Sequence, residues 1–268
     1  MCSSDLAAGS VSLIASARLM DRTGKGMRDA PRDALIADVT PESLRGAAYG
    51  LRQSLDTVGA FVGPLLAMAL MLQWANDYRA VFWVATIPAV LALLVLYVGV
   101  REPVVADRKR LQNPITRANL QQLRAAYWWL VALGAGLTLA RFSEAFLVLR
   151  AQQDGLPLAW TPLVLIAMNL VYAVLAYPFG QWSDRINPRL LLGASLLVLM
   201  GAHSLLAYGR FGVWAGIVLW GLHMAMAQGL MAALVANTAP AHLRGTAFGL
   251  FNVVSGLVLL DRKSTRLN

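Results

Sequence analysis

Two pairs of charged side chains lie inside long apolar stretches of this sequence, where a carboxylate can bind and release a proton. Arg52 and Asp56 are four residues apart, and Arg141 and Glu144 are three apart. A lone charge in hydrocarbon costs about 2.5–3.5 kcal/mol on insertion scales, so such charges pair with one another or face water. We expect Glu144 first, and Asp56 second, to provide a protonatable coupling site. In the alternative interpretation, each pair only neutralises its own charges.

Other polar side chains lie in the same kind of apolar stretch. We expect Asn169, Tyr172 and His223 to face a central cavity, and for His223 the alternative is a hydrogen-bonded packing role. No His-Glu-x-x-His motif is present, and Gly24-Lys25-Gly26 lacks the rest of a nucleotide-binding loop. The sequence therefore predicts no metal site, no cofactor and no enzyme.

The elements that position these residues are predicted to be membrane-spanning helices. Apolar residues make up 58% of the chain and charged residues 14%, and the mean hydropathy is +0.58. This composition excludes a soluble globular domain, which has about 45–50% apolar and about 25% charged residues. A helix needs about 20 apolar residues to cross a bilayer. Such stretches occupy residues 46–72, 80–100, 127–149, 162–180, 190–208 and 212–236, with incomplete ones before and after them.

Basic residues alternate between the connections of these spans. One set of connections holds ten, namely Arg45, Arg101, Arg108, Lys109, Arg110, Arg117, Arg124, Arg185, Arg189 and Arg244. The other set holds three, namely Arg79, Arg150 and Arg210. Because basic loops stay in the cytoplasm, the first set predicts the inner side of a cytoplasmic membrane. The net charge of +9 is spread between apolar runs, so we expect membrane lipid and not nucleic acid as its partner.

An internal repeat organises the chain. Residues 34–51 (ALIADVTPESLRGAAYGL) align without a gap on residues 233–250 (ALVANTAPAHLRGTAFGL), and ten of the 18 positions are identical. Six predicted helices begin between the copies. Since six is even, both copies face the same side of the membrane, as in transporters built from two parallel halves.

Three motifs, in order along the chain, resemble those of the major facilitator superfamily. The loop 180–189 (GQWSDRINPR) is similar to its signature loop in the second half. Arg18, Asp21, Gly24 and Gly26 resemble its helix 4 motif, although Asp21 and Arg22 replace the usual Gln and Gly. Gly59, Gly63 and Pro64 resemble a helix 5 motif associated with exporters, and export rests on this motif alone.

This resemblance implies a partial fold of that family, a polytopic helical bundle of two six-helix pseudo-repeats that are both incomplete. Residues 7–100 would hold helices 4–6, residues 101–126 a cytoplasmic linker and residues 127–260 helices 7–11. Residues 1–6 and 261–268 are similar to translations of a sequencing adapter in opposite orientations, so we expect them to be foreign.

Charged residues at the cytoplasmic ends predict a gate. We expect Asp184 to meet the start of the helix near Arg45 and Gly46, because the helix dipole attracts a carboxylate there. Arg185 or Arg189 is expected to reach Glu42. The alternative is an ordinary basic loop without a latch.

For the stretch from Arg18 to Asp33, the sequence leaves two predictions open. Wound as one helix, it presents a basic stripe that would draw an anionic substrate toward the cytoplasmic side. Gly24, Gly26 and Pro31 instead favour a frayed helix end that runs into a loop.

The function predicted from the sequence is secondary active transport of a small-molecule substrate by alternating access. We expect a proton-coupled, monomeric, multi-pass protein of the inner membrane. The alternative is a sensor or scaffold of the same fold that does not transport.

Overall fold

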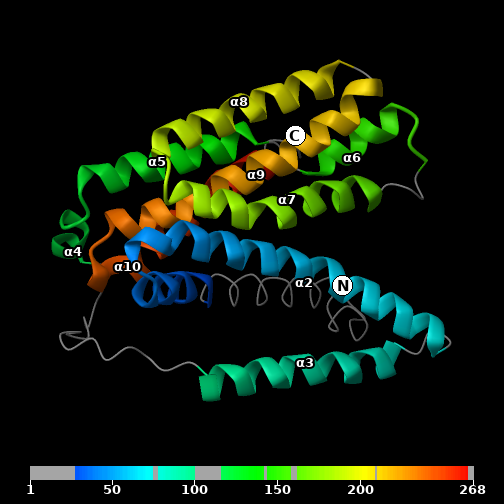
Figure 1. Ribbon diagram of the computed structural model, residues 1–268, viewed down its shortest axis with the longest axis horizontal. Coiled ribbons are helices and arrows are strands. Elements are labelled where there is room, and N and C mark those ends of the chain that lie inside the picture. The colour runs from blue at the N-terminus through cyan, green and yellow to red at the C-terminus, as the bar shows by residue number, and fades with distance from the viewer. Residues whose placement is uncertain are drawn as a thin grey trace. The chain divides into compact units, whose positions relative to one another are not determined.

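The computed structural model describes residues 28–74, 78–99, 116–141, 144–157, 162–208 and 210–264, and in these ranges the chain forms helices and no strand (Figure 1). A first helix covers residues 28–39. The longer helices that follow are α2 (Arg45–Gln73), α3 (Tyr78–Gly99), α5 (Ala125–Ala140), α6 (Glu144–Gln153), α7 (Pro162–Ser183), α8 (Pro188–Ala207), α9 (Arg210–Thr238) and α10 (Arg244–Ser264). The short helix α4 (Arg117–Gln121) is capped by Thr116, whose side chain accepts a hydrogen bond from the Asn119 nitrogen.

Four segments are long and apolar enough to cross a membrane by length and composition: Ala125–Gln153, Pro162–Ser183, Pro188–Ala207 and Gly212–Thr238. They coincide with four of the six predicted spans. The other two spans fall on α2 and α3, which have 29 and 22 residues and so also have the necessary length. Pro88 and Pro178 lie inside helices, as membrane helices tolerate. The chain is an all-α membrane protein.

One predicted helix is divided in two. The sequence predicted a single span over residues 127–149, but α5 ends at Ala140 and α6 begins at Glu144. The cause lies at Arg141, whose backbone is extended, with φ −82° and ψ 112°. Arg141 and Glu144 therefore do not share a helix face, as their spacing in one helix had suggested.

The chain divides into two compact units, each described by itself. The first contains residues 59–109 together with the N-terminal 29 residues, and the second contains residues 30–58 and 110–268. In the first unit, α3 exposes most of its apolar side chains, with Trp83 and Tyr97 at 77% and 88% exposure. Such a surface suits contact with lipid.

The core of the second unit surrounds α9. This helix packs against α7 and α8 and buries Ile217, Trp220 and Val235 almost completely. A second contact joins α5 to α10, where the Tyr127 hydroxyl donates a hydrogen bond to the Ala247 carbonyl at 2.8 Å. The first half of α2 lies in this same unit, so residues from both copies of the repeat share one core.

The two copies of the repeat have the same local structure. Pro41 precedes a 3-10 turn over Glu42–Leu44, and Pro240 precedes one over Ala241–Leu243. The backbone angles of the prolines agree, at φ −54°, ψ 147° and φ −55°, ψ 144°. Each turn leads into a long helix that begins at an arginine, Arg45 or Arg244.

Candidate functional site

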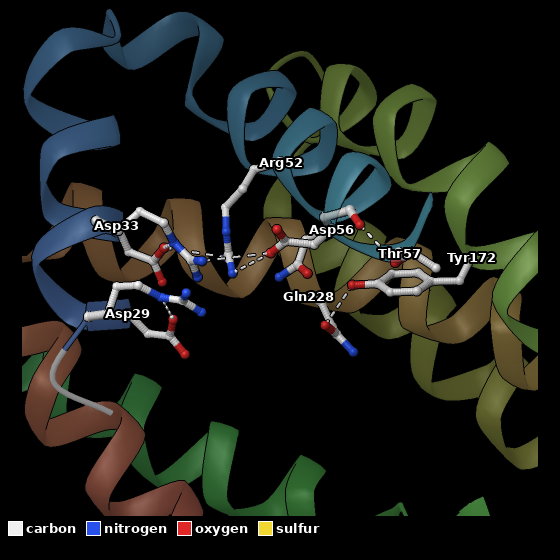
Figure 2. Close-up of polar contacts among 10 residues, drawn as sticks. Asp29, Asp33, Arg52, Asp56, Thr57, Tyr172 and Gln228 are labelled. Atoms are coloured by element: carbon white, nitrogen blue, oxygen red, sulfur yellow. Dashed lines mark hydrogen bonds and ion pairs between the residues drawn. The ribbon is translucent and has the colours of Figure 1, made fainter. Parts of the chain in front are cut away.

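Four charged side chains form a cluster between the first helix and α2, made of Arg32, Asp33, Arg52 and Asp56. Arg52 lies between the two carboxylates: its Nη2 is 2.9 Å from Asp56 Oδ2 and its Nη1 is 3.4 Å from Asp33 Oδ1. Arg32 Nε is also 3.4 Å from Asp33 Oδ1. Figure 2 shows Asp33, Arg52 and Asp56 turned toward one another from the two helices. We call this the four-charge cluster.

The burial of the cluster is uneven. The Asp33 side chain is 11% exposed, while that of Asp56 is 51% exposed. Two cations and two anions give the cluster no net charge, which lowers the cost of placing these groups in a low-dielectric region. The contact predicted between Arg52 and Asp56 is therefore present, and it is part of the four-charge cluster.

Polar contacts from helices of the second half surround this cluster. The Tyr172 hydroxyl on α7 donates a hydrogen bond to Gln228 Oε1 on α9 at 2.7 Å (Figure 2). The Ser54 hydroxyl donates to the Ala173 carbonyl and so links α2 to α7. The charges of Arg52, Asp56 and Arg141 all act on the Tyr172 hydroxyl. Charged groups of the first half thus lie close to polar groups of the second.

At the start of α2, Asp184 accepts two backbone hydrogen bonds. Its Oδ1 is 2.7 Å from the Gly46 nitrogen and its Oδ2 is 2.8 Å from the Ala47 nitrogen. These are amide groups that a helix start leaves without partners, and the helix dipole adds to the attraction. The predicted contact between Asp184 and the helix start near Gly46 is thus found.

Glycines allow α2 to approach α7 this closely. A Cβ added at Gly46 would lie 2.0 Å from Ser183 Oγ and 2.5 Å from the Gly180 carbonyl oxygen. One added at Gly50 would lie 2.4 Å from the Ala176 carbonyl oxygen. Backbone atoms cannot move aside as a flexible side chain can, so the crossing depends on glycine.

Each arginine of the repeat forms a hydrogen bond with a residue of the other copy. Arg45 donates to Asn237 Oδ1, and Arg244 Nη1 donates to Asp38 Oδ1 at 2.7 Å. Asp38 and Asn237 are equivalent positions in the repeat, as are the two arginines. Tyr49 and Phe248 are also equivalent positions, and the centroids of their rings lie 6.0 Å apart. We call these contacts the reciprocal arginine lock.

The structure does not bring together all the residues that the sequence grouped. Glu42 and Arg185 line the same cavity of about 730 Å³. Among the described residues, however, neither Arg185 nor Arg189 forms an ion pair with Glu42 in this arrangement, so that contact stays a prediction. Asn187 caps α8 through the Arg189 backbone nitrogen, and Arg185 and Arg189 are both exposed there, which leaves their long side chains in solvent.

The Arg141 and Glu144 pair is also not seen. Glu144 is exposed in the first turn of α6, and Arg141 lies outside that helix, at the end of α5. The break between α5 and α6 explains this, because it removes the helical spacing on which the pairing depended.

His223 is fully buried, and its Nδ1 lies 2.8 Å from the Ser195 carbonyl oxygen, the geometry expected for the packing role that was its alternative. Asn169 is partly buried on α7.

The glycine motifs have different outcomes. No described atom lies within 4 Å of a Cβ built at Gly59 or Gly63, so no close packing is seen around these two residues. Pro64 lies in α2. The motif residues Arg18, Asp21, Gly24 and Gly26 lie outside the described residues, as do residues 1–6.

Asp33 is the member of the four-charge cluster that the sequence reasoning missed. It follows Pro31 and Arg32 in a stretch that was interpreted from its basic residues. A signal was available: Asp33, Arg52 and Asp56 align on Ala232, Phe251 and Ser255 in the second copy, so all three carboxylate or guanidinium groups are particular to the first.

Comparison with known proteins agrees with this arrangement of two halves. A family model described as Major Facilitator Superfamily matches residues 1–260. The chain belongs to the major facilitator superfamily. This membership fits the parallel repeat, because transporters of this superfamily are built from two parallel halves.

The relatives of this superfamily member are distant. It is 32% identical over 252 residues to an uncharacterized MFS-type transporter of Methanocaldococcus jannaschii, a match that covers 90% of the chain and 61% of that protein. It is 24% identical over 237 residues to the multidrug resistance protein MdtH of Proteus mirabilis, covering 86% of the chain and 58% of the relative. The chain thus spans about three-fifths of the length of these relatives. No solved structure matches it.

Proposed function

We propose that this chain is part of a secondary active transporter that moves a small solute across the cytoplasmic membrane by alternating access. The reciprocal arginine lock is the observation that carries the proposal. It joins the end of one half to the equivalent end of the other through Arg45 with Asn237 and Arg244 with Asp38. Two halves that rock against each other need contacts of this kind, which form in one state and break in the other.

The Asp184 contact belongs to the same gate. Both the lock and the Asp184 hydrogen bonds lie at the ends that the basic loops place in the cytoplasm. We assign the described arrangement to a state with these cytoplasmic contacts closed. In the opposite state Asp184 leaves the start of α2, and the Gly46 and Ala47 nitrogens turn to water.

A proton gradient drives the change in this proposal. Asp56 in the four-charge cluster and Glu144 on α6 are the candidate coupling carboxylates, and neither requires a metal or cofactor. Similarity to MdtH, a protein named for multidrug resistance, and the Gly59, Gly63 and Pro64 motif both support export. The protein acts as a monomer in contact with membrane lipid. We place helices 4–6 of the superfamily in residues 7–100 and helices 7–11 in residues 127–260.

The test is a pair of distance measurements on the full-length protein in lipid nanodiscs, by double electron–electron resonance. One spin-label pair, at Ser43→Cys and Ile186→Cys, reports the cytoplasmic ends, where both residues line one cavity. The other, at Gln73→Cys and Tyr208→Cys, reports the opposite ends of α2 and α8. We expect two populations, in which one pair is long whenever the other is short.

A single distance distribution for each pair, unchanged by pH, would instead support the scaffold. For coupling, Asp56→Asn or Glu144→Gln is expected to alter the pH dependence of the populations. If both variants respond to pH as the unmodified protein does, both assignments of the coupling carboxylate are lost.

A further inference from the structure

We propose that Asp33 is the residue that binds the coupling proton, and that Arg52 gives up its contact with Asp33 and keeps its contact with Asp56 when the proton binds. This inference rests on the proposed proton coupling and names a carboxylate within it. It starts from the position of Arg52, which is shared by carboxylates on two helices and whose Nε is buried without a hydrogen-bond partner among the described residues.

The two carboxylates hold Arg52 unequally. Asp56 contacts it at 2.9 Å, as a close ion pair does, whereas Asp33 contacts it at 3.4 Å. Asp33 is also the more buried of the two, with 11% of its side chain exposed against 51% for Asp56. Burial favours the neutral form of a carboxylate, and a longer contact with an arginine opposes it less. Asp33 is therefore the better proton acceptor, and Asp56 is better placed to keep the arginine.

The charge balance explains why proton binding would move the helices. The cluster has no net charge while both carboxylates are ionised. When a proton adds to an Asp33 oxygen, that side chain becomes a neutral acid and the cluster carries one uncompensated positive charge. A buried unpaired charge is strongly unfavourable, so Arg52 and Arg32 must turn toward Asp56 and its exposed side. The proton leaves by the reverse step.

Other charged and titratable groups near Asp33 come from every packed element. Arg28, Asp29 and Arg32 lie on its own helix. On α2, Tyr49 donates a hydrogen bond from its hydroxyl to the Asp33 carbonyl at 2.6 Å, and the charges of Arg45, Arg52 and Arg244 act on that hydroxyl. On α7, Tyr172 lies near Arg52 and Asp56, and Arg141, directly after α5, lies near Tyr172. Among these groups, Asp33 alone combines deep burial with contacts to two arginines.

The first helix connects this site to the gate. Asp33 and Asp38 lie on the same helix, five residues apart, and Asp38 binds Arg244 of the lock. With Asp33 ionised, Arg52 and Tyr49 both hold this helix against α2. With Asp33 neutral, this helix loses its contact with Arg52 and keeps the Tyr49 hydrogen bond to its backbone and the 3.9 Å contact of Arg32 with Asp56. It is then held less firmly, and it can shift and carry Asp38 away from Arg244.

The test uses the cytoplasmic spin-label pair in the full-length protein, with distances measured from mildly acidic to mildly basic pH. We expect Asp33→Asn to remove the pH dependence and to hold the gate in its low-pH distribution throughout. Asp56→Asn should keep a pH dependence with a shifted midpoint. The matched control is Asp154→Asn, directly after α6, whose carboxylate pairs with Arg150 at the same four-residue spacing, at 3.1 Å. It should respond to pH as the unmodified protein does.

A normal pH response in Asp33→Asn would overturn the inference. If Glu144→Gln abolishes the response while Asp33→Asn does not, proton coupling stands and the assignment to Asp33 fails. If the unmodified protein shows two states that ignore pH, proton coupling itself fails, and the inference with it.

Should Asp33→Asn not fold, Asp33→Glu takes its place. We expect it to keep the pH dependence with a moved midpoint, because the longer acid changes its distance to Arg52. An unmoved midpoint in that variant counts against the inference.

Discussion

The two copies of the repeat share their lock but not their charges. Each copy contains a proline, a 3-10 turn and an arginine whose side chain contacts the other copy. Only the first copy has the four-charge cluster. At the positions of Arg32, Asp33, Arg52 and Asp56 the second copy has Met231, Ala232, Phe251 and Ser255. The arginine contacts that both copies share join the two copies. The charged residues of the four-charge cluster, which only the first copy has, can serve another function.

The lock itself is not fully symmetric. Arg244 binds the carboxylate of Asp38, whose side chain is 7% exposed, while Arg45 binds the neutral amide of Asn237. Removing a partner from a buried ion pair leaves an unpaired charge, whereas removing a partner from an amide leaves only an unmade hydrogen bond. The copies should therefore respond differently to the same substitution.

The largest expected effect comes from Arg244→Ala. We expect it to lower the free energy of unfolding by about 3 kcal/mol, because the largely buried Asp38 carboxylate loses the guanidinium that lies 2.7 Å away. The equivalent Arg45→Ala should cost about 1 kcal/mol, as Asn237 is uncharged. Reversible unfolding of the full-length protein in mixed micelles measures both. Equal losses would mean that the charge on Asp38 contributes nothing.

A smaller effect is expected from equivalent glycines. Gly46→Ala should cost about 1–3 kcal/mol, because the added Cβ meets backbone of α7. Its counterpart Gly245 has no described atom within 4 Å of a built Cβ. We expect Gly245→Ala to be neutral or to stabilise by up to about 1 kcal/mol through helix propensity. The same unfolding assay compares them, and a loss of similar size at both sites would contradict the α2–α7 crossing described above.

Asp184→Asn is expected to have a smaller effect still. The amide can accept only one of the two backbone hydrogen bonds and loses the attraction to the helix dipole, at a cost of about 0.3–2 kcal/mol. Arg185→Gln is the control, since Arg185 is exposed and should leave stability unchanged. Added salt should weaken the Asp184 contribution; a salt-independent loss would argue against the dipole as its source.

The smallest change is expected when the two copies trade residues. Asp38→Asn together with Asn237→Asp moves the ion pair from Arg244 to Arg45. The double variant should unfold within about 1 kcal/mol of the unmodified protein, because the same groups still pair across the lock. Asp38→Asn alone should be less stable than the double, because both arginines of the lock then face amides. If the double variant is no more stable than Asp38→Asn alone, the two positions are not equivalent.

Much of the fold could be predicted because it depends on local sequence. Apolar runs set the lengths of the helices, and the repeat predicted that the copies near Pro41 and Pro240 have equivalent structures. The contact of Asp184 with the start of α2 could be predicted because the dipole at a helix start attracts a carboxylate. Arg52 and Asp56 could be paired because both lie on one helix.

What could not be predicted depends on tertiary placement. Asn237 gave no signal of its own, since its partner Arg45 comes from the other copy of the repeat. Asp33 was missed because its partner Arg52 lies on another helix. The pairing of Arg141 with Glu144 failed because a local backbone change at Arg141 ends α5, and hydropathy does not report such a break.

The central claim is that the two copies are like-facing ends of parallel halves, and cysteine labelling tests it most directly. Ser43 and His242 are equivalent and exposed, and each would be replaced by cysteine, one at a time, in a full-length protein from which any other cysteine has been removed. A membrane-impermeant maleimide should label both positions in inside-out vesicles and neither in intact cells. Labelling of one position from each side of the membrane would contradict the parallel repeat, and with it the lock and the proposed transport cycle.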